Sequence, residues 1–201
     1  MPTDITALTL EPSDPQFIYI GTANGIYRSV DGGISASRIT GPNVSVYFAE
    51  IVPNPLSSAT LYAVTLNGLL KSTTRGESWN GVSLFSNINP PAALVFDPVA
   101  PATIYVATPR GVYKSVNEGV DWQIPHPSVS YEVLDLVIER VNPQTLYGIS
   151  LFGVNRFLIK STNGGGTWSS SSFPAGITPM MLIADPNQTG VLYALTTQHG
   201  I

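Results

Sequence analysis

Two acidic residues, Glu50 and Asp135, stand in apolar surroundings and are the side chains best suited to acid–base chemistry. Ile-Tyr or Leu-Tyr pairs recur along the chain. Alignment on these pairs puts both acids at one equivalent position, which elsewhere holds Ala7, Ala93 and Met181. A carboxyl group in apolar surroundings has a raised pKa unless it is paired, and a general acid needs a raised pKa. Glu50 and Asp135 are therefore the candidate catalytic residues.

Other roles for these two carboxylates remain open. They could be solvated in a central channel, pair with a basic residue such as Arg140, or help to bind a cation. An inverting glycosidase needs carboxyl groups roughly 6.5–9.5 Å apart. Two repeats of chain separate Glu50 from Asp135, which is a wide spacing for that mechanism.

The sequence gives little evidence for a metal site or for a nucleophilic Cys or Ser. His126 and His199 lack ligand spacing, so loop positions suit them better than metal binding. The chain has no Cys, which excludes disulfides and a Cys nucleophile. No Ser has a His and an Asp placed to activate it. We expect neither a metal nor a cofactor.

The recurring pairs mark repeats that must position these residues. Their tyrosines are 43, 43, 42 and 46 residues apart and are predicted to be buried: Tyr19, Tyr62, Tyr105, Tyr147 and Tyr193. Each Tyr lies in an apolar run. Another run and a Pro-containing turn come before it, and two further runs follow. Four antiparallel strands in a repeat of this length form one blade of a β-propeller.

The predicted fold is all-β, a single propeller domain over 1–201. Four full blades are expected at about 5–44, 45–90, 91–131 and 132–176, with a partial fifth at 177–201. An open blade exposes unpaired backbone and an apolar face. We therefore expect a piece of a longer propeller or an unusual completion of the last blade, and the incomplete blade could also support self-association.

An eight-residue segment joins the third and fourth strands of each full repeat, and Ser161–Trp168 is its clearest copy. Asp or Asn in third place can close a turn through backbone N–H groups, and Gly in fifth place allows a positive φ. Trp in eighth place would bury about 200 Å² against the neighbouring sheet. The residues given structural roles are Ser29, Asp31, Gly33, Ser72, Gly76, Trp79, Ser115, Asn117, Gly119, Trp122, Ser161, Asn163, Gly165 and Trp168.

Two copies of this octet depart from the pattern. Thr74 stands in third place of the second copy, and Ala36 stands in eighth place of the first. We expect these two turns to be the weaker ones. A basic residue comes directly before each octet and is predicted to be solvated: Arg28, Lys71, Lys114 and Lys160.

The octet resembles the Asp box, or bacterial neuraminidase repeat, of pattern S-x-D-x-G-x-T-W. That resemblance implies a β-propeller in which the box is a structural turn remote from the ligand site. Asp-box propellers include sialidases, xyloglucan-cleaving glycoside hydrolases, sortilin-type receptors and a photosystem II assembly factor. The resemblance also favours an extracellular or periplasmic location, although the sequence leads us to expect no signal peptide in this chain.

The catalytic motifs of these families are not found. The sialidase Arg-Ile-Pro motif is absent, and the arginines do not recur at one blade position. The sequence of residues 97–115 is similar to the repeats of xyloglucanase-like and uncharacterised bacterial repeat proteins. Those hydrolases carry a catalytic Asp in a Thr-Asp-x-Gly-Gly segment, whereas this chain has Thr22-Ala23-Asn24-Gly25 there.

Composition excludes some classes of partner. The formal net charge is −4, and the nine Lys and Arg residues are spread singly, which argues against nucleic acid. No segment has the length and hydropathy to insert into a membrane.

Loops at the end of the blades opposite the octets are the expected ligand-binding mouth. They include the longest connection, Ser150 to Arg156, and the candidate ligand-binding residues are Asn24, Asn67, Arg110, Arg156 and Tyr131. The leading hypothesis is a non-catalytic binding or scaffold propeller for a glycan or protein. The alternatives are a glycoside hydrolase, or part of one, and a protein like the photosystem assembly factor.

Overall fold

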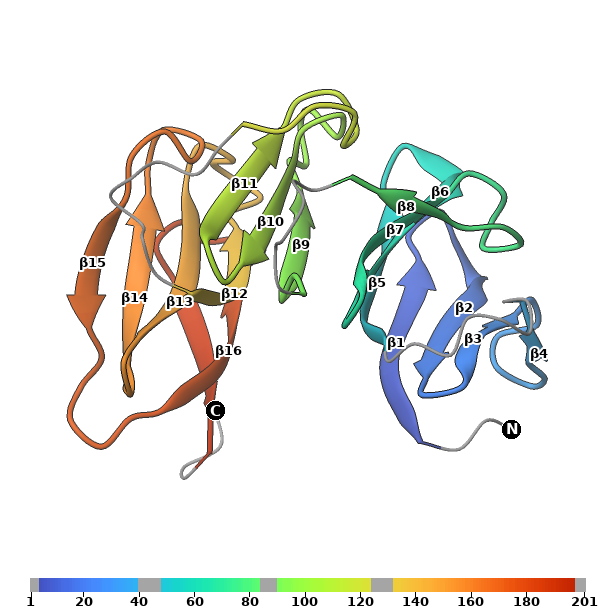
Figure 1. The fold of residues 1–201 in the computed structure, drawn as a ribbon, viewed down its shortest axis with the longest axis horizontal. Helices are drawn as coiled ribbons and strands as arrows, with labels where there is room; N and C mark the ends of the chain where they lie inside the picture. The colour runs from blue at the N-terminus through green and yellow to red at the C-terminus, as the bar shows by residue number, and fades with distance from the viewer. Residues whose placement is uncertain (1–3, 40–47, 84–89, 124–131, 198–201) are drawn as a thin grey trace. The chain divides into compact units, whose positions relative to one another are not determined.

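The computed structural model describes residues 4–39, 48–83, 90–123 and 132–197, without the side chains of Phe48 and Ala49. The candidate Tyr131 and both histidines lie outside these ranges. In the described ranges all regular secondary structure is β-strand, arranged in five antiparallel sheets (Figure 1). The described residues contain no helix that is long and apolar enough to cross a bilayer.

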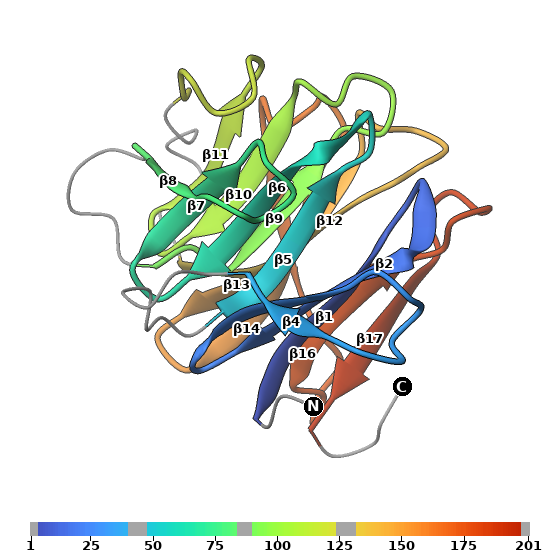
Figure 2. The same cartoon turned by 90° about the vertical axis from the view of Figure 1, so that its right-hand side faces the viewer.

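The chain forms two compact units, Met1–Pro91 and Ala92–Ile201. Unit 1 holds two four-stranded sheets (Figure 2). The first sheet contains β1 (Ile5–Glu11), β2 (Asp14–Thr22), β3 (Gly25–Ser29) and β4 (Ser37–Arg38). The second contains β5 (Phe48–Asn54), β6 (Ser57–Thr65), β7 (Gly68–Ser72) and β8 (Asn80–Val82). In both sheets, strands that follow one another in the chain are neighbours.

Unit 2 holds the other three sheets. The first contains β9 (Ala93–Phe96), β10 (Ile104–Thr108) and β11 (Gly111–Ser115), and an isolated bridge pairs Lys114 with Gln123. The second contains β12 (Glu132–Ile138), β13 (Leu146–Phe152), β14 (Asn155–Ser161) and β15 (Ser169–Ser172). The third contains β16 (Pro179–Ala184) and β17 (Leu192–Thr196). The prediction of one domain with the stated blade limits stays a prediction.

One register is repeated in all five sheets. The position shared by Glu50 and Asp135 always pairs with the residue two places after the recurring Tyr: Ala7 with Gly21, Glu50 with Val64, Ala93 with Ala107, Asp135 with Ile149, and Met181 with Leu195. The register shifts just before this position in β1, β5, β12 and β16. The alignment made on the tyrosines is therefore confirmed at the level of strand pairing.

The core lies between neighbouring sheets of each unit. Tyr19 and Ile26 pack on Ile51 and Leu61 in unit 1, and Tyr105 and Val112 pack on Leu136 and Leu146 in unit 2. Four of the five recurring tyrosines are buried as predicted, at 4% exposure or less. Tyr193 is 43% exposed, because its side of the two-stranded sheet is uncovered.

Candidate functional site

The four octet turns share one pattern of hydrogen bonds. The hydroxyl of the first Ser accepts a hydrogen bond from the fifth-place Gly N at 2.8–2.9 Å in all four copies. The third-place side-chain oxygen accepts one from the seventh-place N at 2.8–2.9 Å. Fifth-place Gly has φ between 82° and 93° in all four copies, a conformation that disfavours a side chain. These polar residues are thus engaged in closing the turns.

The two departures from the pattern have different consequences. Thr74 supplies a hydroxyl that accepts the Ser78 N–H at 2.9 Å, so this turn keeps the bond that an Asp or Asn makes elsewhere. In the three octets with Trp, the indole Nε1–H donates to the fifth-place Gly O at 2.9–3.1 Å and the ring is half-buried. The first octet lacks that anchor, because Ala36 has no donor.

The basic residues before the octets are half-buried, so the prediction that they are solvated is wrong. Lys71, Lys114 and Lys160 lie 5.1–5.4 Å from the ring centroids of the tyrosines with which they pair across the strands. Attraction to the ring face and packing of the aliphatic stem favour this placement over full solvation.

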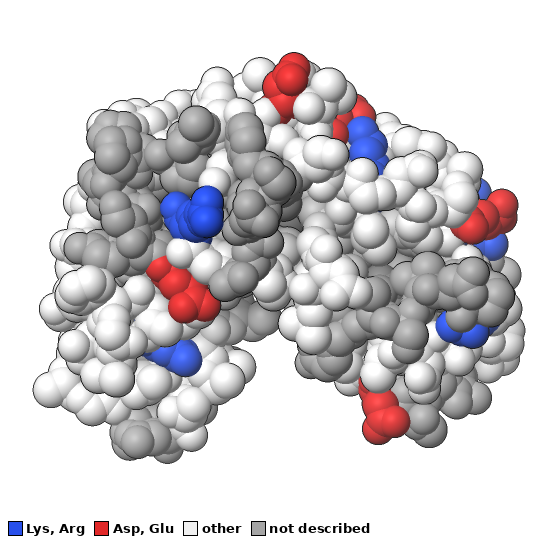
Figure 3. Space-filling view, in the orientation of Figure 1, with Lys and Arg blue, Asp and Glu red and all other residues white. Residues whose placement is uncertain are grey.

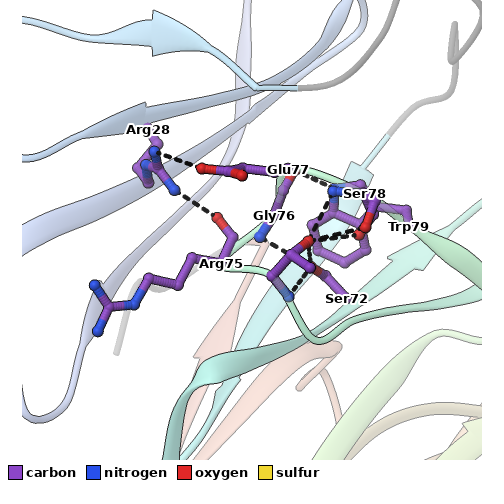
Figure 4. Close-up of polar contacts among 8 residues, drawn as sticks. Arg28, Ser72, Arg75, Gly76, Glu77, Ser78 and Trp79 are labelled. Atoms are coloured by element: carbon purple, nitrogen blue, oxygen red, sulfur yellow. Dashed lines mark hydrogen bonds and ion pairs between the residues drawn. The ribbon is translucent and has the colours of Figure 1, made fainter.

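Two of these cations also bind the octet of the next sheet. Arg28 Nη1 donates to the carbonyl of Arg75 at 2.9 Å, and Arg28 Nη2 lies 3.7 Å from Glu77 Oε1 (Figure 4). Lys114 Nζ donates to the carbonyl of Gly164 at 3.0 Å. Arg75 and Gly164 both hold the fourth place of their octets, so the same position is recognised in both units.

Acidic or amide residues that the sequence prediction missed stand eight places before each Tyr: Glu11, Asn54, Asp97, Glu139 and Asp185. Asp97 and Asp185 each accept two backbone N–H groups of the following turn at 2.9–3.0 Å, and Asn54 accepts one at 2.9 Å. Glu139 instead accepts the Tyr147 hydroxyl at 3.0 Å and the Gly190 N–H at 2.8 Å. The constant offset from Tyr was the signal that could have found them.

The two candidate acids lie in different units. Glu50 is a half-buried residue of β5 in unit 1, and Asp135 is a half-buried residue of β12 in unit 2. Burial raises the pKa of Asp135, as the apolar position predicts, although backbone hydrogen bonds oppose the rise. One of those bonds runs from Leu182 N to Asp135 Oδ2 at 2.6 Å and ties β16 to β12. The Asp135 carboxylate is thus engaged in a hydrogen bond between two sheets.

Three candidate mouth residues occupy equivalent turns. The backbone N–H of Asn24, Asn67 and Arg110 donates at 3.1–3.2 Å to the hydroxyl of the Thr two places earlier. All three residues are exposed. Their backbone thus supports a turn, and their side chains are accessible to a ligand.

The connection predicted to be longest is in fact a two-residue turn. β13 continues to Phe152 and β14 begins at Asn155, so only Gly153 and Val154 lie between the strands. Gly153 has φ 62°, which suits a tight turn. The prediction of a loop from Ser150 to Arg156 is therefore wrong, and this hairpin projects Val154 with 91% exposure.

Arg156 borders a cavity of about 360 Å³ at this end of unit 2. We call it the Arg156 cavity. Its walls come from the β13–β14 turn, the start of β14, the end of β15 and the segment before β16, and they consist of Val154, Asn155, Arg156, Phe157, Ser172, Phe173, Ile177 and Thr178. The Arg156 guanidinium donates to the Pro179 carbonyl, which fixes the cation at the wall.

Charge is sparse around these features. Basic and acidic side chains are few on the face in Figure 3 and adjoin one another at several places, and they form no stripe of one sign there. None of the residues lining the Arg156 cavity is Asp or Glu. In the described ranges, no group of three or more His, Asp and Glu residues could hold a metal ion. The cavity can offer apolar contact, hydrogen bonds and one cation.

The fold of this chain is similar to those of several solved structures. No family model matches the chain, and no curated protein matches it. Among solved structures, an ancestral GH74 enzyme is 20% identical with a TM-score of 0.78 over 96% of this chain. The GH74 xyloglucanase from Xanthomonas campestris is 16% identical with a TM-score of 0.76 over 94%, and YCF48 bound to D1 peptide is 14% identical with a TM-score of 0.70 over 96%.

These structures are propellers, and similarity at this level of identity shows the fold alone. The chain spans 29% and 35% of the two GH74 proteins and 60% of the YCF48 chain. Its sheets thus have the architecture of a β-propeller.

Proposed function

We propose that this chain is a non-catalytic binding module and that the Arg156 cavity is its ligand site. The observation that carries the proposal is the lining of the cavity, which combines two phenyl rings, two aliphatic side chains and one fixed cation, with no carboxylate. Sites that bind without chemistry need shape, apolar surface and a few polar anchors. The four octets, which we infer to be Asp boxes of a propeller with four full blades and a partial fifth, lie at the opposite end of the sheets.

A peptide is the ligand class that this lining suits best. Phe157, Phe173 and Ile177 can receive an apolar side chain, while Arg156 and Asn155 can bind backbone carbonyls or a carboxylate. The structure of YCF48 bound to D1 peptide supports peptide binding for a protein of this fold. A glycan would use the same phenyl rings as stacking surfaces, with Asn155 and Ser172 as hydrogen-bonding groups.

Calorimetric titration of the purified chain tests the proposal. The probes are a synthetic D1 peptide, a panel of unrelated peptides, and xyloglucan oligosaccharides. We expect Arg156→Ala and Phe173→Ala to weaken the binding of a peptide at least about tenfold, corresponding to about 1.4 kcal/mol or more. Val99→Ala, at a position 78% exposed and outside the cavity, is the matched control.

The titration also separates the ligand classes. Binding of the oligosaccharides without binding of any peptide would identify a glycan, and not a peptide, as the ligand class. Binding of the D1 peptide, but not of the unrelated peptides, would favour the assembly-factor alternative. Affinity that both cavity variants leave unchanged would place the ligand site elsewhere and contradict the proposal.

A glycoside hydrolase is the second candidate, and one observation favours it. Burial raises the pKa of Asp135, which suits a proton donor, and two of the similar structures are GH74 proteins. The hydrogen bond from Leu182 N opposes this role, because it favours the charged carboxylate. We expect the wild-type chain to release no sugar from xyloglucan. Release that Glu50→Ala or Asp135→Ala abolishes would establish the hydrolase instead.

A further inference from the structure

Two sheets of this protein each present an uncovered apolar side. The first side belongs to β1 and β2 and consists of Leu8, Leu10, Ile18 and Ile20, which pair across the strands. Leu8 is 67% exposed and Leu10 is 55% exposed, whereas Ile20 is 7% exposed, so the uncovered part of this side is the part formed by β1. We call this surface the Leu8 face. Leucines at such exposure on one side of a regular sheet are typical of a surface that has a partner.

The second side belongs to β16 and β17 and consists of Met181, Ile183, Tyr193 and Leu195. Met181 pairs with Leu195 and Ile183 pairs with Tyr193, so the four side chains lie on one side of the sheet. Their exposed fractions run from 39% to 50%. We call this surface the Tyr193 face. The opposite side of the same sheet is covered, with Leu182 only 3% exposed against Tyr147 and Ile149.

The repeat shows which kinds of side pack together. In three sheet-to-sheet contacts, the Tyr side of one sheet packs on the Leu8-equivalent side of the next sheet: Tyr19 meets Ile51, Tyr105 meets Leu136, and Tyr147 meets Leu182. The buried tyrosines are 0–4% exposed and their aliphatic partners are 2–3% exposed. The contact is always between unlike sides.

The Leu8 face is a Leu8-equivalent side of a sheet, and the Tyr193 face is a Tyr side. Leu8 occupies the place of Ile51, Leu136 and Leu182, counted from the recurring Tyr, and Tyr193 occupies the place of Tyr19, Tyr105 and Tyr147. Each face therefore has the residue types that its counterpart buries in three other contacts. Within its own unit each face has exposed apolar side chains.

We propose that the Tyr193 face of one chain binds the Leu8 face of a second copy. This inference does not depend on the Arg156 cavity. Because the two faces differ, the contact is heterologous, and each copy keeps one free face after the first contact, so that the pair still presents one face of each kind. The assembly therefore grows head to tail and does not stop at a symmetric dimer. Burial of these side chains supplies the affinity.

Sedimentation velocity of the full chain tests the proposal. We expect the mean mass of the wild type to rise beyond a dimer between about 5 µM and about 500 µM, the range of weak contacts of this size. Leu8→Glu and Ile183→Glu each place a charge in one face, and each variant alone should stay monomeric. Val99→Glu adds the same charge at a position 78% exposed on neither face and should behave as the wild type.

A mixture of the two variants gives the sharper result. Leu8→Glu keeps an intact Tyr193 face, and Ile183→Glu keeps an intact Leu8 face. Their equimolar mixture should form a one-to-one dimer and nothing larger. A wild type that is monomeric throughout, a single variant that still associates, or a mixture that stays monomeric would each overturn the proposal.

Cysteine cross-linking covers the case in which a glutamate variant does not fold. The chain has no Cys, so Leu8→Cys and Ile183→Cys introduce the only thiols. Under mild oxidation, mixed Leu8→Cys and Ile183→Cys chains should form a heterodimer in several-fold excess over either homodimer. A yield equal to random collision, as measured with Val99→Cys, would contradict a specific contact between the faces.

Discussion

Trp168 anchors its turn in two ways. The indole packs half-buried against the core that contains Tyr105, and its N–H donates to the Gly165 carbonyl at 3.1 Å. We expect Trp168→Ala to lower the free energy of unfolding by about 2–4 kcal/mol, below the loss for a fully buried Trp. Trp168→Phe keeps most of the packing and should cost about 1–2 kcal/mol. Urea denaturation measures both, and equal losses would mean that packing of the ring contributes nothing.

Asp135 gives a pH-dependent prediction at the same scale. Burial raises its pKa in the folded state, so its contribution to stability is favourable when it is protonated and is lost as the pH rises through the folded pKa. We expect Asp135→Asn to raise Tm by a few degrees at pH 7, because Asn still accepts the Leu182 N–H without a charge. The gain should shrink as the pH falls towards 4.

Asp185 is the control of opposite sign. Hydrogen bonds from the backbone of Asn187 and from other groups lower its pKa, so its contribution is present at neutral pH and is lost as the pH falls. Asp185→Asn should therefore lower Tm at pH 7. A common sign for the two variants would contradict the assignment of burial to Asp135 and of hydrogen bonding to Asp185.

At the scale of elements, a single carbonyl joins two sheets of unit 2. Gly164 O accepts hydrogen bonds from Lys114 Nζ at 3.0 Å and from Tyr105 OH at 3.2 Å. We expect Lys114→Met and Tyr105→Phe to cost about 0.5–1.5 kcal/mol each. The double variant should cost more than the sum, because it leaves the carbonyl of a buried residue without either donor. A double-mutant cycle by urea denaturation measures the coupling, and strict additivity would mean that water replaces the donors.

Strand order and register could be predicted because equivalent residues lie at constant sequence distances from the recurring Tyr of each repeat. The same offsets place the octets, since a fixed spacing from Tyr puts Ser and Gly at the same places in every turn. The length of the β13–β14 turn could not be predicted in this way. Ser150 to Phe152 looked like loop because β13 continues to Phe152, five places after Tyr147, whereas β2, β6 and β10 end three places after their Tyr. Strand length depends on neighbours that sequence spacing does not encode.

The state of the charged residues was also beyond the sequence. Lys114 was predicted to be solvated because nothing in the residues around it identifies its partner, a carbonyl 50 positions away. Glu139 escaped notice for the same reason, since its two partners come from β13 and from the turn before β17. For Glu50 and Asp135, periodicity predicted the equivalent strand position, whereas the bond from Leu182 needed the packing of two sheets.

At the scale of the whole molecule, the buried tyrosines make the protein sensitive to alkali. Burial, with the charge of Asp97 beside it, raises the pKa of Tyr105 to about 12, and burial raises the pKa of Tyr19 and of Tyr147 as well. Stability from these phenols is complete below the unfolded pKa of about 10 and is lost as the pH rises through the folded values. We expect Tm to fall by several degrees between pH 9 and pH 11.

Tyr105→Phe is the matched variant for this fall. It removes one phenol whose ionisation is disfavoured by burial in the folded state, so its Tm should decline less than that of the wild type over the same pH range. Thermal melts followed by circular dichroism measure both chains. An identical decline would mean that groups other than Tyr105 control alkaline unfolding.

The contact between a cation and the fourth-place carbonyl of the next octet has a consequence for how such a chain can change in length. Arg28 and Lys114 make this contact from the same strand position, and each contact joins only neighbouring repeats. Duplication or loss of one entire 43-residue period leaves every such joint with a donor and an acceptor of the same kind. Insertion of a few residues inside a period instead separates Tyr, cation and octet at once. A gene encoding this architecture can therefore gain or lose whole repeats, whereas an insertion or deletion of part of a repeat disrupts the contacts between sheets.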